Sequence, residues 1–205
     1  GSGVVRRGTL LLSSGARVPV AVKLLDTGVD GGGGQPLNAH SRALAQEVHV
    51  LSRLDHPNVV RFYGGSLDPH SPFLVEELCE VSLHRVIHEK DSWGAPLHPY
   101  GLADVLRMLR DIAAGLAYLH PTVVHRDLKP GNVLLDSNGV AKISDFGLAR
   151  FKQNTALATT EVDVGTAAYM SPEQFAPAAE LKVSDRTDVF ALGMTAWELV
   201  TRQRP

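Results

Sequence analysis

Three short strings of this sequence carry residues that could do chemistry. They are His125-Arg126-Asp127-Leu128-Lys129-Pro130-Gly131-Asn132, then Asp145-Phe146-Gly147, and, nearer the start, Val20-Ala21-Val22-Lys23. Asp145 follows Asp127 by 18 residues, which leaves room between them for only one β-hairpin. Carboxylate and amide oxygens are hard ligands that suit Mg²⁺, and the lysine ammonium is a flexible-stemmed point charge.

The elements that must position these residues are β-rich in the first third of the chain. Short apolar runs predict strands over residues 4–5, 9–12 and 18–25, and the glycine-rich stretch 28–34 predicts a loop. Apolar residues at helical spacing then predict a helix from near residue 39 to residue 54, which His56-Pro57 stops. The runs 58–63 and 73–78 are again typical of strands.

After Cys79 the pattern becomes mostly helical. A broad apolar stripe predicts a helix over residues 102–120, and a second apolar helix is expected over 184–201. Between them, residues 133–135 and 140–143 are expected to be short strands around the turn 136–139. We therefore expect a small strand-dominated lobe over residues 1–78 and a larger, mainly helical lobe over residues 79–205.

Taken together, the three strings resemble the signature set of protein kinases. Ser171-Pro172-Glu173 ends 28 residues beyond Asp145, where that family closes its activation segment with Ala-Pro-Glu. The resemblance implies one protein kinase domain over residues 1–205. Its fold would be the α+β, bilobal kinase fold, with a β-rich N-lobe (1–78) and a larger helical C-lobe (79–205). Lys129 together with Thr166 is the pattern of serine/threonine kinases, and Trp197-Glu198-Leu199 looks most like their tyrosine-kinase-like group.

The resemblance implies catalytic roles for four residues, which are Asp127, Lys129, Lys23 and Glu47. Lys23 would hold the α- and β-phosphates of ATP, and Glu47 would keep it aimed. Glu47 lies ten residues before Pro57 on a predicted helix, where the alternative is an ordinary solvated helix residue. Asp127 would accept or orient the proton of the substrate hydroxyl, and Lys129 would reach the γ-phosphate.

The same resemblance implies a site for ATP and Mg²⁺. Asn132 and Asp145 would bind the metal jointly with phosphate oxygens. Glu76 fills the position at the back of the adenine pocket, where the family has a neutral side chain, and His125 would be a packed structural residue. The residues that match ATP-binding positions, including the adenine sandwich and the hinge, are Gly3, Val5, Ala21, Lys23, Glu77, Cys79, Leu134 and Asp145.

Regulation would involve the activation segment. In the family, an arginine in the position of Arg126 pairs with a phosphate on that segment, which an upstream activating kinase would supply. The candidate regulatory threonines are Thr155, Thr159, Thr160 and Thr166, for which ordinary loop residues are the alternative. The resemblance also implies that Asp188 opens the central helix of the C-lobe and braces the 125–132 loop.

Composition excludes several classes of partner. The chain has 205 residues and a formal net charge of −2, so no global basicity points to nucleic acid. No run approaches the roughly 18 apolar residues of a membrane-spanning helix. The single cysteine, Cys79, cannot form an internal disulfide, which favours a reducing intracellular setting, and we expect the protein in the cytoplasm.

The ends depart from the family pattern. Only the last glycine of the glycine-rich loop is represented, by Gly3, and the family has further helices beyond the position of Pro205. We therefore expect a domain truncated at both ends, and 205 residues that are poorly soluble or unstable alone. The alternative function is a catalytically impaired kinase-like scaffold that binds nucleotide or protein partners. A small-molecule kinase is disfavoured by the segment 165–173, which docks the protein substrate in protein kinases.

Overall fold

The computed structural model describes residues 4–25, 48, 51–66, 68, 71–145, 164–175 and 184–205. The chain divides into two compact units. Unit 1 comprises Gly1–Asp55 with Val60–Cys79, and unit 2 comprises His56–Val59 with Glu80–Pro205. Within the described residues, no helix combines the length and the apolar character that crossing a membrane requires.

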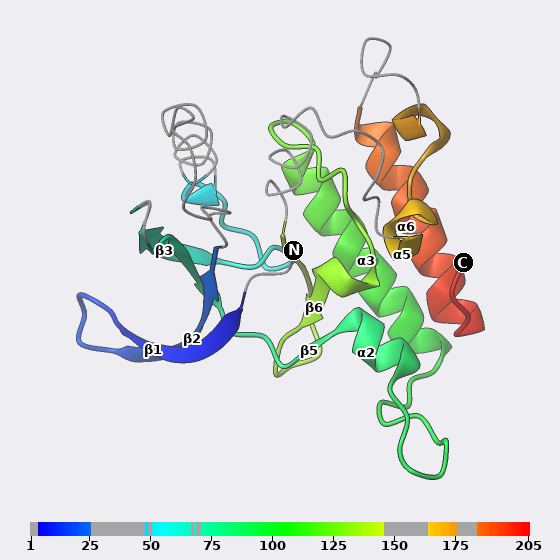
Figure 1. The fold of residues 1–205 in the computed structure, drawn as a ribbon, viewed down its shortest axis with the longest axis horizontal. Coiled ribbons are helices and arrows are strands. Elements are labelled where there is room, and N and C mark those ends of the chain that lie inside the picture. Colours follow the sequence, from blue (N-terminus) through cyan, green and yellow to red (C-terminus); the bar gives the residue numbers. More distant parts are fainter. Residues whose placement is uncertain are drawn as a thin grey trace, which may run out of the picture. The chain divides into compact units, whose positions relative to one another are not determined.

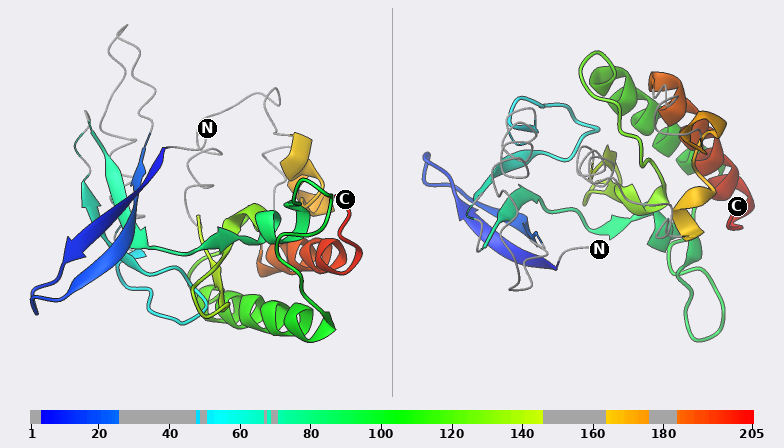
Figure 2. Two further views of the ribbon diagram at one scale, coloured as in Figure 1. Left: turned by 90° about the horizontal axis from the view of Figure 1, so that it is seen from below. Right: turned by 45° about the horizontal axis from the view of Figure 1, so that its top comes forward.

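Unit 1 is built on a four-stranded antiparallel sheet in the order β1-β2-β4-β3. The strands are β1 (Val5–Leu11), β2 (Arg17–Leu24), β3 (Phe62–Ser66) and β4 (Phe73–Glu77). β1 and β2 form a long twisted ribbon (Figure 2) whose turn places Gly15 at a φ of 82°, a left-handed conformation that glycine adopts without strain. Val20 and Leu74 are almost fully buried and anchor the sheet. The predicted strands over 18–25 and 73–78 are confirmed to within one residue.

Unit 2 contains a small sheet and a set of helices. Its strands β5 (Val81–Ser82), β6 (Val133–Leu135) and β7 (Ala141–Ile143) form one antiparallel sheet in that order. The helices are α2 (Leu83–His88), α3 (Leu102–Leu119), η1 (Pro130–Asn132), α5 (Val164–Ala167), η2 (Pro172–Phe175) and α6 (Asp185–Thr201). The long helices α3 and α6 lie side by side (Figures 1 and 2). The helices predicted over 102–120 and 184–201 are thereby confirmed, with Ser184 capping α6.

The strand predicted over residues 58–63 is wrong for residues 58–61. β3 begins only at Phe62, and His56–Val59 belong to unit 2. There the His56 ring stacks on Tyr118 of α3, with 4.8 Å between ring centroids, and the Asn58 carbonyl accepts the N–H of Ile143 at 2.9 Å. Asn58, Val59 and Val60 are all buried, and a short apolar run of this kind cannot be distinguished from a strand by its pattern alone.

Gly115 allows α3 to approach this segment closely. A Cβ atom at this position would lie 2.6 Å from the Asn58 carbonyl oxygen and 2.9 Å from Cδ1 of Ile143. Ile112, Leu116 and Leu119 on the same helix are buried in the core of unit 2, as the apolar stripe predicted. The helix therefore supports β7 and, through it, the residues that follow β7.

Candidate active site

The loop 125–132, called the catalytic loop below, holds the carboxylate of Asp127 on both sides. Asn132 donates from Nδ2 to the Asp127 carbonyl at 2.7 Å and to its Oδ2 at 3.0 Å. Lys129 Nζ lies 3.2 Å from Oδ1 of the same carboxylate. About a fifth of the Asp127 side chain (21%) stays exposed, so the held carboxylate is accessible to a substrate group. This arrangement can orient a hydroxyl that donates to one of its remaining lone pairs.

Lys129 has a second partner in the segment that follows the undescribed stretch 146–163. Its Nζ donates to Oγ1 of Thr166 at 2.7 Å. Because an ammonium group has three protons, it can serve Asp127 and Thr166 together and keep a donor for a phosphate oxygen. The structure thus brings together three residues that were predicted separately as catalytic or regulatory.

The β6–β7 hairpin brings the two predicted metal ligands to one end of one element. Val133 pairs with Ile143, so Asn132 and Ser144 flank the same end of the ladder. The Asn132 carbonyl accepts from the Ser144 N–H at 2.9 Å and from its hydroxyl at 3.0 Å. The prediction that a single hairpin separates Asp127 from Asp145 is confirmed.

Asp145 lies two residues beyond that hairpin and has a left-handed conformation, with a φ of 56°. Such a conformation costs an L-residue roughly 1–2 kcal/mol. Since Nδ2 of Asn132 is directed at Asp127, its Oδ1 is the atom that can ligate a metal. An amide oxygen and a carboxylate at the open end of one hairpin are a donor set that suits Mg²⁺ shared with phosphate.

His125 is structural rather than catalytic. The ring is almost fully buried, Nδ1 accepts from the Asp127 N–H at 3.2 Å, and Nε2 lies 2.9 Å from the Ser144 carbonyl. Only the neutral tautomer with a proton on Nε2 satisfies both partners. The imidazole therefore links the catalytic loop to the residue before Asp145, as the sequence analysis expected.

Asp188 supports the catalytic loop from the first turn of α6. Its completely buried carboxylate accepts the N–H groups of His125 and Arg126, both at 2.8 Å, and lies 3.0 Å from Nε2 of His120. The positive end of the α6 dipole stabilises the charge. Arg126 has a φ of 69°, so the loop turns sharply just where Asp188 holds it. The bracing role expected for Asp188 is confirmed.

Two contacts of the segment 166–175 were not predicted from the sequence. Gln174 donates from Nε2 to the Arg126 carbonyl at 3.1 Å, so both backbone polar groups of Arg126 are held. The buried Thr187 hydroxyl donates to Glu173 at 3.1 Å. The pKa of Glu173 is lowered first by its own backbone N–H and also by hydrogen bonds from Ser171 and Thr187. No local pattern marks Gln174 or Thr187, since their partners lie 48 and 14 residues away.

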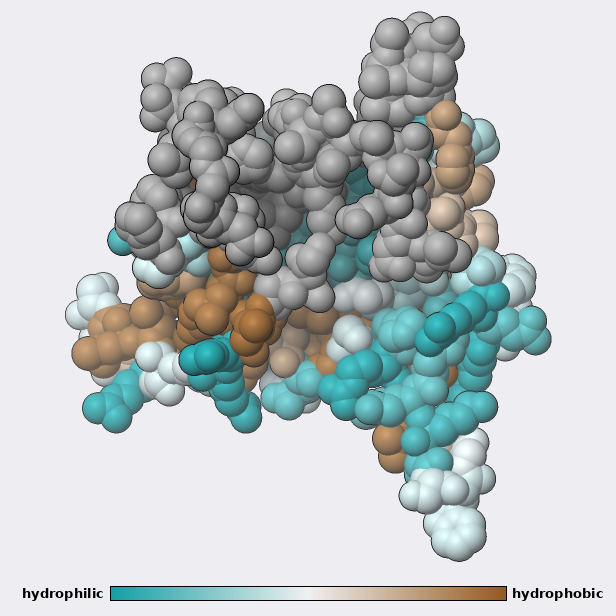
Figure 3. All heavy atoms as spheres, viewed as in Figure 1, coloured by the Kyte–Doolittle hydropathy of each residue, from teal (hydrophilic) through white to brown (hydrophobic). Residues whose placement is uncertain are grey.

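In unit 1, three of the predicted ATP-binding residues share one face of the sheet. Val5 pairs with Lys23, and Ala21 pairs with Glu76. Directly opposite residues point to the same face, as do residues two apart on a strand, so these four side chains lie together. Val4, Val5 and Leu11 are exposed. Figure 3 shows hydrophobic side chains gathered over the β1–β2 region.

The predicted hinge residues lie where the chain leaves unit 1. Glu77 ends β4, and its N–H donates to the Arg61 carbonyl at 2.8 Å. Cys79 is half-buried and is the last residue of unit 1, while Leu134 lies in the middle of β6 in unit 2. The remaining predicted site residues lie outside the described residues, and these are Gly3, Glu47, Thr155, Thr159 and Thr160.

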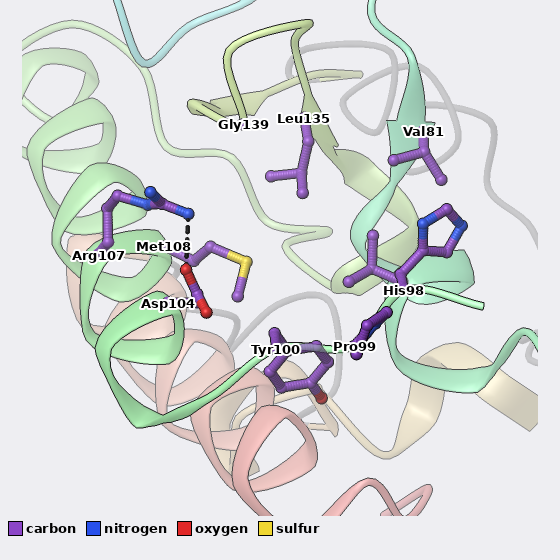
Figure 4. Close-up of a pocket in the computed structure, with 10 residues that line it drawn as sticks. Val81, His98, Pro99, Tyr100, Asp104, Arg107, Met108, Leu135 and Gly139 are labelled. Atoms are coloured by element: carbon purple, nitrogen blue, oxygen red, sulfur yellow. Dashed lines mark hydrogen bonds and ion pairs between the residues drawn. The ribbon is translucent and has the colours of Figure 1, made fainter. Parts of the chain in front are cut away.

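A shallow pocket of about 180 Å³ in unit 2 is separate from this constellation (Figure 4). Its wall is formed by β5, α2, α3 and the loop before α3, and the figure shows the ion pair between Arg107 and Asp104 at its rim. None of the predicted catalytic or ATP-binding residues lines this pocket. Its lining residues are Val81, Val86, His98, Pro99, Tyr100, Asp104, Arg107, Met108, Leu135 and Gly139.

Comparison with known proteins gives a match along the whole chain. The family model described as "Protein kinase domain" matches residues 1–205. The probable serine/threonine-protein kinase SIS8 of Arabidopsis thaliana is 41% identical over 163 residues, which cover 78% of this chain and 15% of that protein. The probable serine/threonine-protein kinase drkC of Dictyostelium discoideum is 37% identical, over 79% of this chain and 21% of its own.

A bacterial relative is similar over more of its length. The serine/threonine-protein kinase PknL of Mycobacterium tuberculosis is 34% identical over 189 residues, which cover 91% of this chain and 44% of that protein. The chain thus spans less than half the length of each of these three relatives.

Proposed function

Because this chain belongs to the protein kinase domain family, we propose that the protein transfers the γ-phosphate of ATP to serine or threonine hydroxyls of protein substrates. The observation that carries the proposal is the hold on Asp127, whose two carboxylate oxygens contact Asn132 and Lys129. Lys129 in turn contacts Thr166, and these two residues form the serine/threonine-type pattern.

Each residue of the constellation has a defined task in this proposal. Asp127 orients the acceptor hydroxyl and takes its proton as the new bond to phosphorus forms. Lys129 stays beside that carboxylate and neutralises charge on the transferred group, held in place by the Thr166 hydroxyl. Oδ1 of Asn132 and the Asp145 carboxylate would hold Mg²⁺, which neutralises phosphate charge when ATP is bound.

Further parts of the proposal concern ATP and regulation. On the shared face of the unit 1 sheet, Lys23 would contact the α- and β-phosphates, and Val5 and Ala21 would contact adenine. Arg126 would pair with a phosphate that an upstream kinase places on the activation segment. The Arg126 N–H and carbonyl are held by Asp188 and Gln174, which supports a fixed position of Arg126 for binding that phosphate.

The single cysteine supports a reducing compartment, and we place the protein in the cytoplasm.

The test is transfer of labelled phosphate from ATP to a generic protein substrate. The Asp127→Asn variant keeps the size of the side chain and removes its basicity, so the rate should fall by about 10²- to 10⁴-fold. The matched control is Asp104→Asn, since Asp104 is a partly exposed aspartate paired with Arg107 on α3, and it should keep full activity. Equal incorporation by the parent and Asp127→Asn would remove Asp127 from the mechanism. A parent protein that binds ATP without any transfer would favour the scaffold alternative.

A further inference from the structure

Two histidines of α2 and one glutamate of α6 form a cluster that the proposed phosphoryl transfer does not use. One nitrogen each of His84 and His88 and one carboxylate oxygen of Glu198 all lie within 4.8 Å of one another. Among the residues that the structure describes, no other group of three histidine, cysteine or acidic side chains is gathered in this way. The two helices are drawn in green and in orange to red in Figure 1.

The two histidines are held one helical turn apart. They stand at positions i and i+4 of α2, so they share a helix face, and their ring centroids are 4.9 Å apart. The Ser82 side chain caps the start of the short helix by accepting the Arg85 N–H. Leu83, Val86 and Ile87 anchor its other face in the core. The spacing of the two imidazoles is therefore fixed by the fold, and this spacing on a helix is one that binds zinc in proteins.

Glu198 supplies a buried negative charge beside them. Its side chain is completely buried, its Oε1 lies 2.6 Å from Nε2 of His88, and its Oε2 accepts the Tyr169 hydroxyl proton. Within the described part of the chain, His88 is its sole ion-pair partner within 4.0 Å. A buried carboxylate is costly unless a cation compensates it, so the site favours a bound cation.

We propose that His84, His88 and Glu198 bind one divalent cation of the zinc class. Two imidazole nitrogens and one carboxylate oxygen form a ligand set that zinc uses in proteins, with a water molecule in the fourth position. Such a mixed nitrogen and oxygen set disfavours Mg²⁺ and Ca²⁺, which take oxygen ligands. The proposal does not depend on the kinase activity.

Binding requires small side-chain movements. Tetrahedral zinc with bonds of about 2.0 Å holds its ligand atoms about 3.3 Å apart. The His88 and Glu198 atoms must therefore separate slightly, and the most distant pair must move closer. His84 is half-buried and can make this adjustment. Burial and then the neighbouring His88 lower the pKa of His84.

Arg204 is the charge that opposes a cation at this site. It contributes to the lowered pKa of His84, and its side chain is exposed. Because an exposed guanidinium can turn towards solvent, its repulsion of a bound cation is screened by water. The buried Glu198 carboxylate, by contrast, cannot turn away, so the balance of charge favours the cation.

Zinc binding to the purified, tag-free protein tests the proposal directly. The protein is stripped with a chelator and titrated with Zn²⁺ against a chromophoric zinc indicator, without ATP. We expect the His84→Ala variant to bind zinc at this site at least about tenfold more weakly than the parent. His98→Ala is the matched control, because His98 is a more exposed histidine beside Glu89, outside the cluster, and it should bind as the parent does.

Two further readouts separate the site from adventitious binding. Zinc at ten times its dissociation constant should raise the melting temperature of the parent and of His98→Ala by about 3–5 °C, but not that of His84→Ala. Cobalt in place of zinc should give the intense visible absorption of a tetrahedral site in the parent and in His98→Ala, but not in His84→Ala. Equal zinc affinity of the parent and His84→Ala, or no binding by the parent at micromolar zinc, would overturn the proposal.

Discussion

Asp188 is the residue whose replacement tests the architecture of the catalytic loop most directly. Its buried carboxylate accepts two backbone N–H groups, from His125 and Arg126, and also contacts His120. In the Asp188→Asn variant one of the two oxygens becomes an NH₂ group. Whichever oxygen is replaced, this donor then faces a backbone N–H, which loses its acceptor.

The expected loss of stability follows from these contacts. A buried donor without an acceptor costs about 1–3 kcal/mol, and the other hydrogen bonds lose the assistance of the charge, which adds about 1 kcal/mol. We therefore expect Asp188→Asn to lower the free energy of unfolding by about 2–4 kcal/mol. For a chain of this size, this corresponds to a melting temperature lower by roughly 5–15 °C.

Denaturation followed by circular dichroism measures this effect, and Asp185→Asn is the matched control. Asp185 stands one turn earlier on the same helix but is exposed, so its replacement removes only an interaction with the helix dipole, worth at most about 1 kcal/mol. The phosphoryl-transfer rate should also fall for Asp188→Asn and stay unchanged for Asp185→Asn. If Asp188→Asn is no more destabilising than the control, the brace does not hold the loop as described.

Four further changes test other parts of the structure. Gly115→Ala should lower stability by about 1–3 kcal/mol in thermal denaturation, because its Cβ would lie 2.6 Å from the Asn58 carbonyl oxygen; a neutral result would contradict the close approach of α3. Thr195→Val should leave the free energy of unfolding unchanged or raise it by up to about 1 kcal/mol, because the buried Thr195 hydroxyl has no hydrogen-bond partner among the described residues. A large loss of stability would show that this hydroxyl does have a hydrogen-bond partner. Thr166→Val should lower kcat about tenfold by releasing Lys129, and Thr166→Ser should restore it; equal rates for the two variants would exclude this positioning role. Glu173 has a lowered pKa, so its carboxylate stabilises the fold above its ordinary pKa of 4.5 and loses this effect as the pH falls through the pKa of the folded protein. Glu173→Gln should therefore flatten the loss of melting temperature on acidification. An unchanged pH profile of the melting temperature would contradict this role of Glu173.

Local patterns in the sequence predicted most of the elements that carry the site. The apolar stripe predicted α3, and the 18-residue spacing between Asp127 and Asp145 predicted the β6–β7 hairpin. Both predictions succeed because the relevant interactions join residues that are close in the sequence. Residues 58–61 were predicted as strand and are not, because Asn58 and its neighbours pack against α3 and β7 instead.

The family of this chain and the residue types of its catalytic loop could be inferred from the amino-acid sequence. Resemblance to the kinase motifs placed Asp127, Asn132 and Asp145 in order, and it pointed to Asp188 as the brace. The contacts between side chains distant in the sequence become visible in the folded chain, where Lys129 contacts Thr166 and Gln174 contacts the Arg126 carbonyl. The fold also gathers His84, His88 and Glu198 from helices 110 residues apart. Such contacts depend on how helices and loops pack, and packing directions leave no periodic signal in the chain.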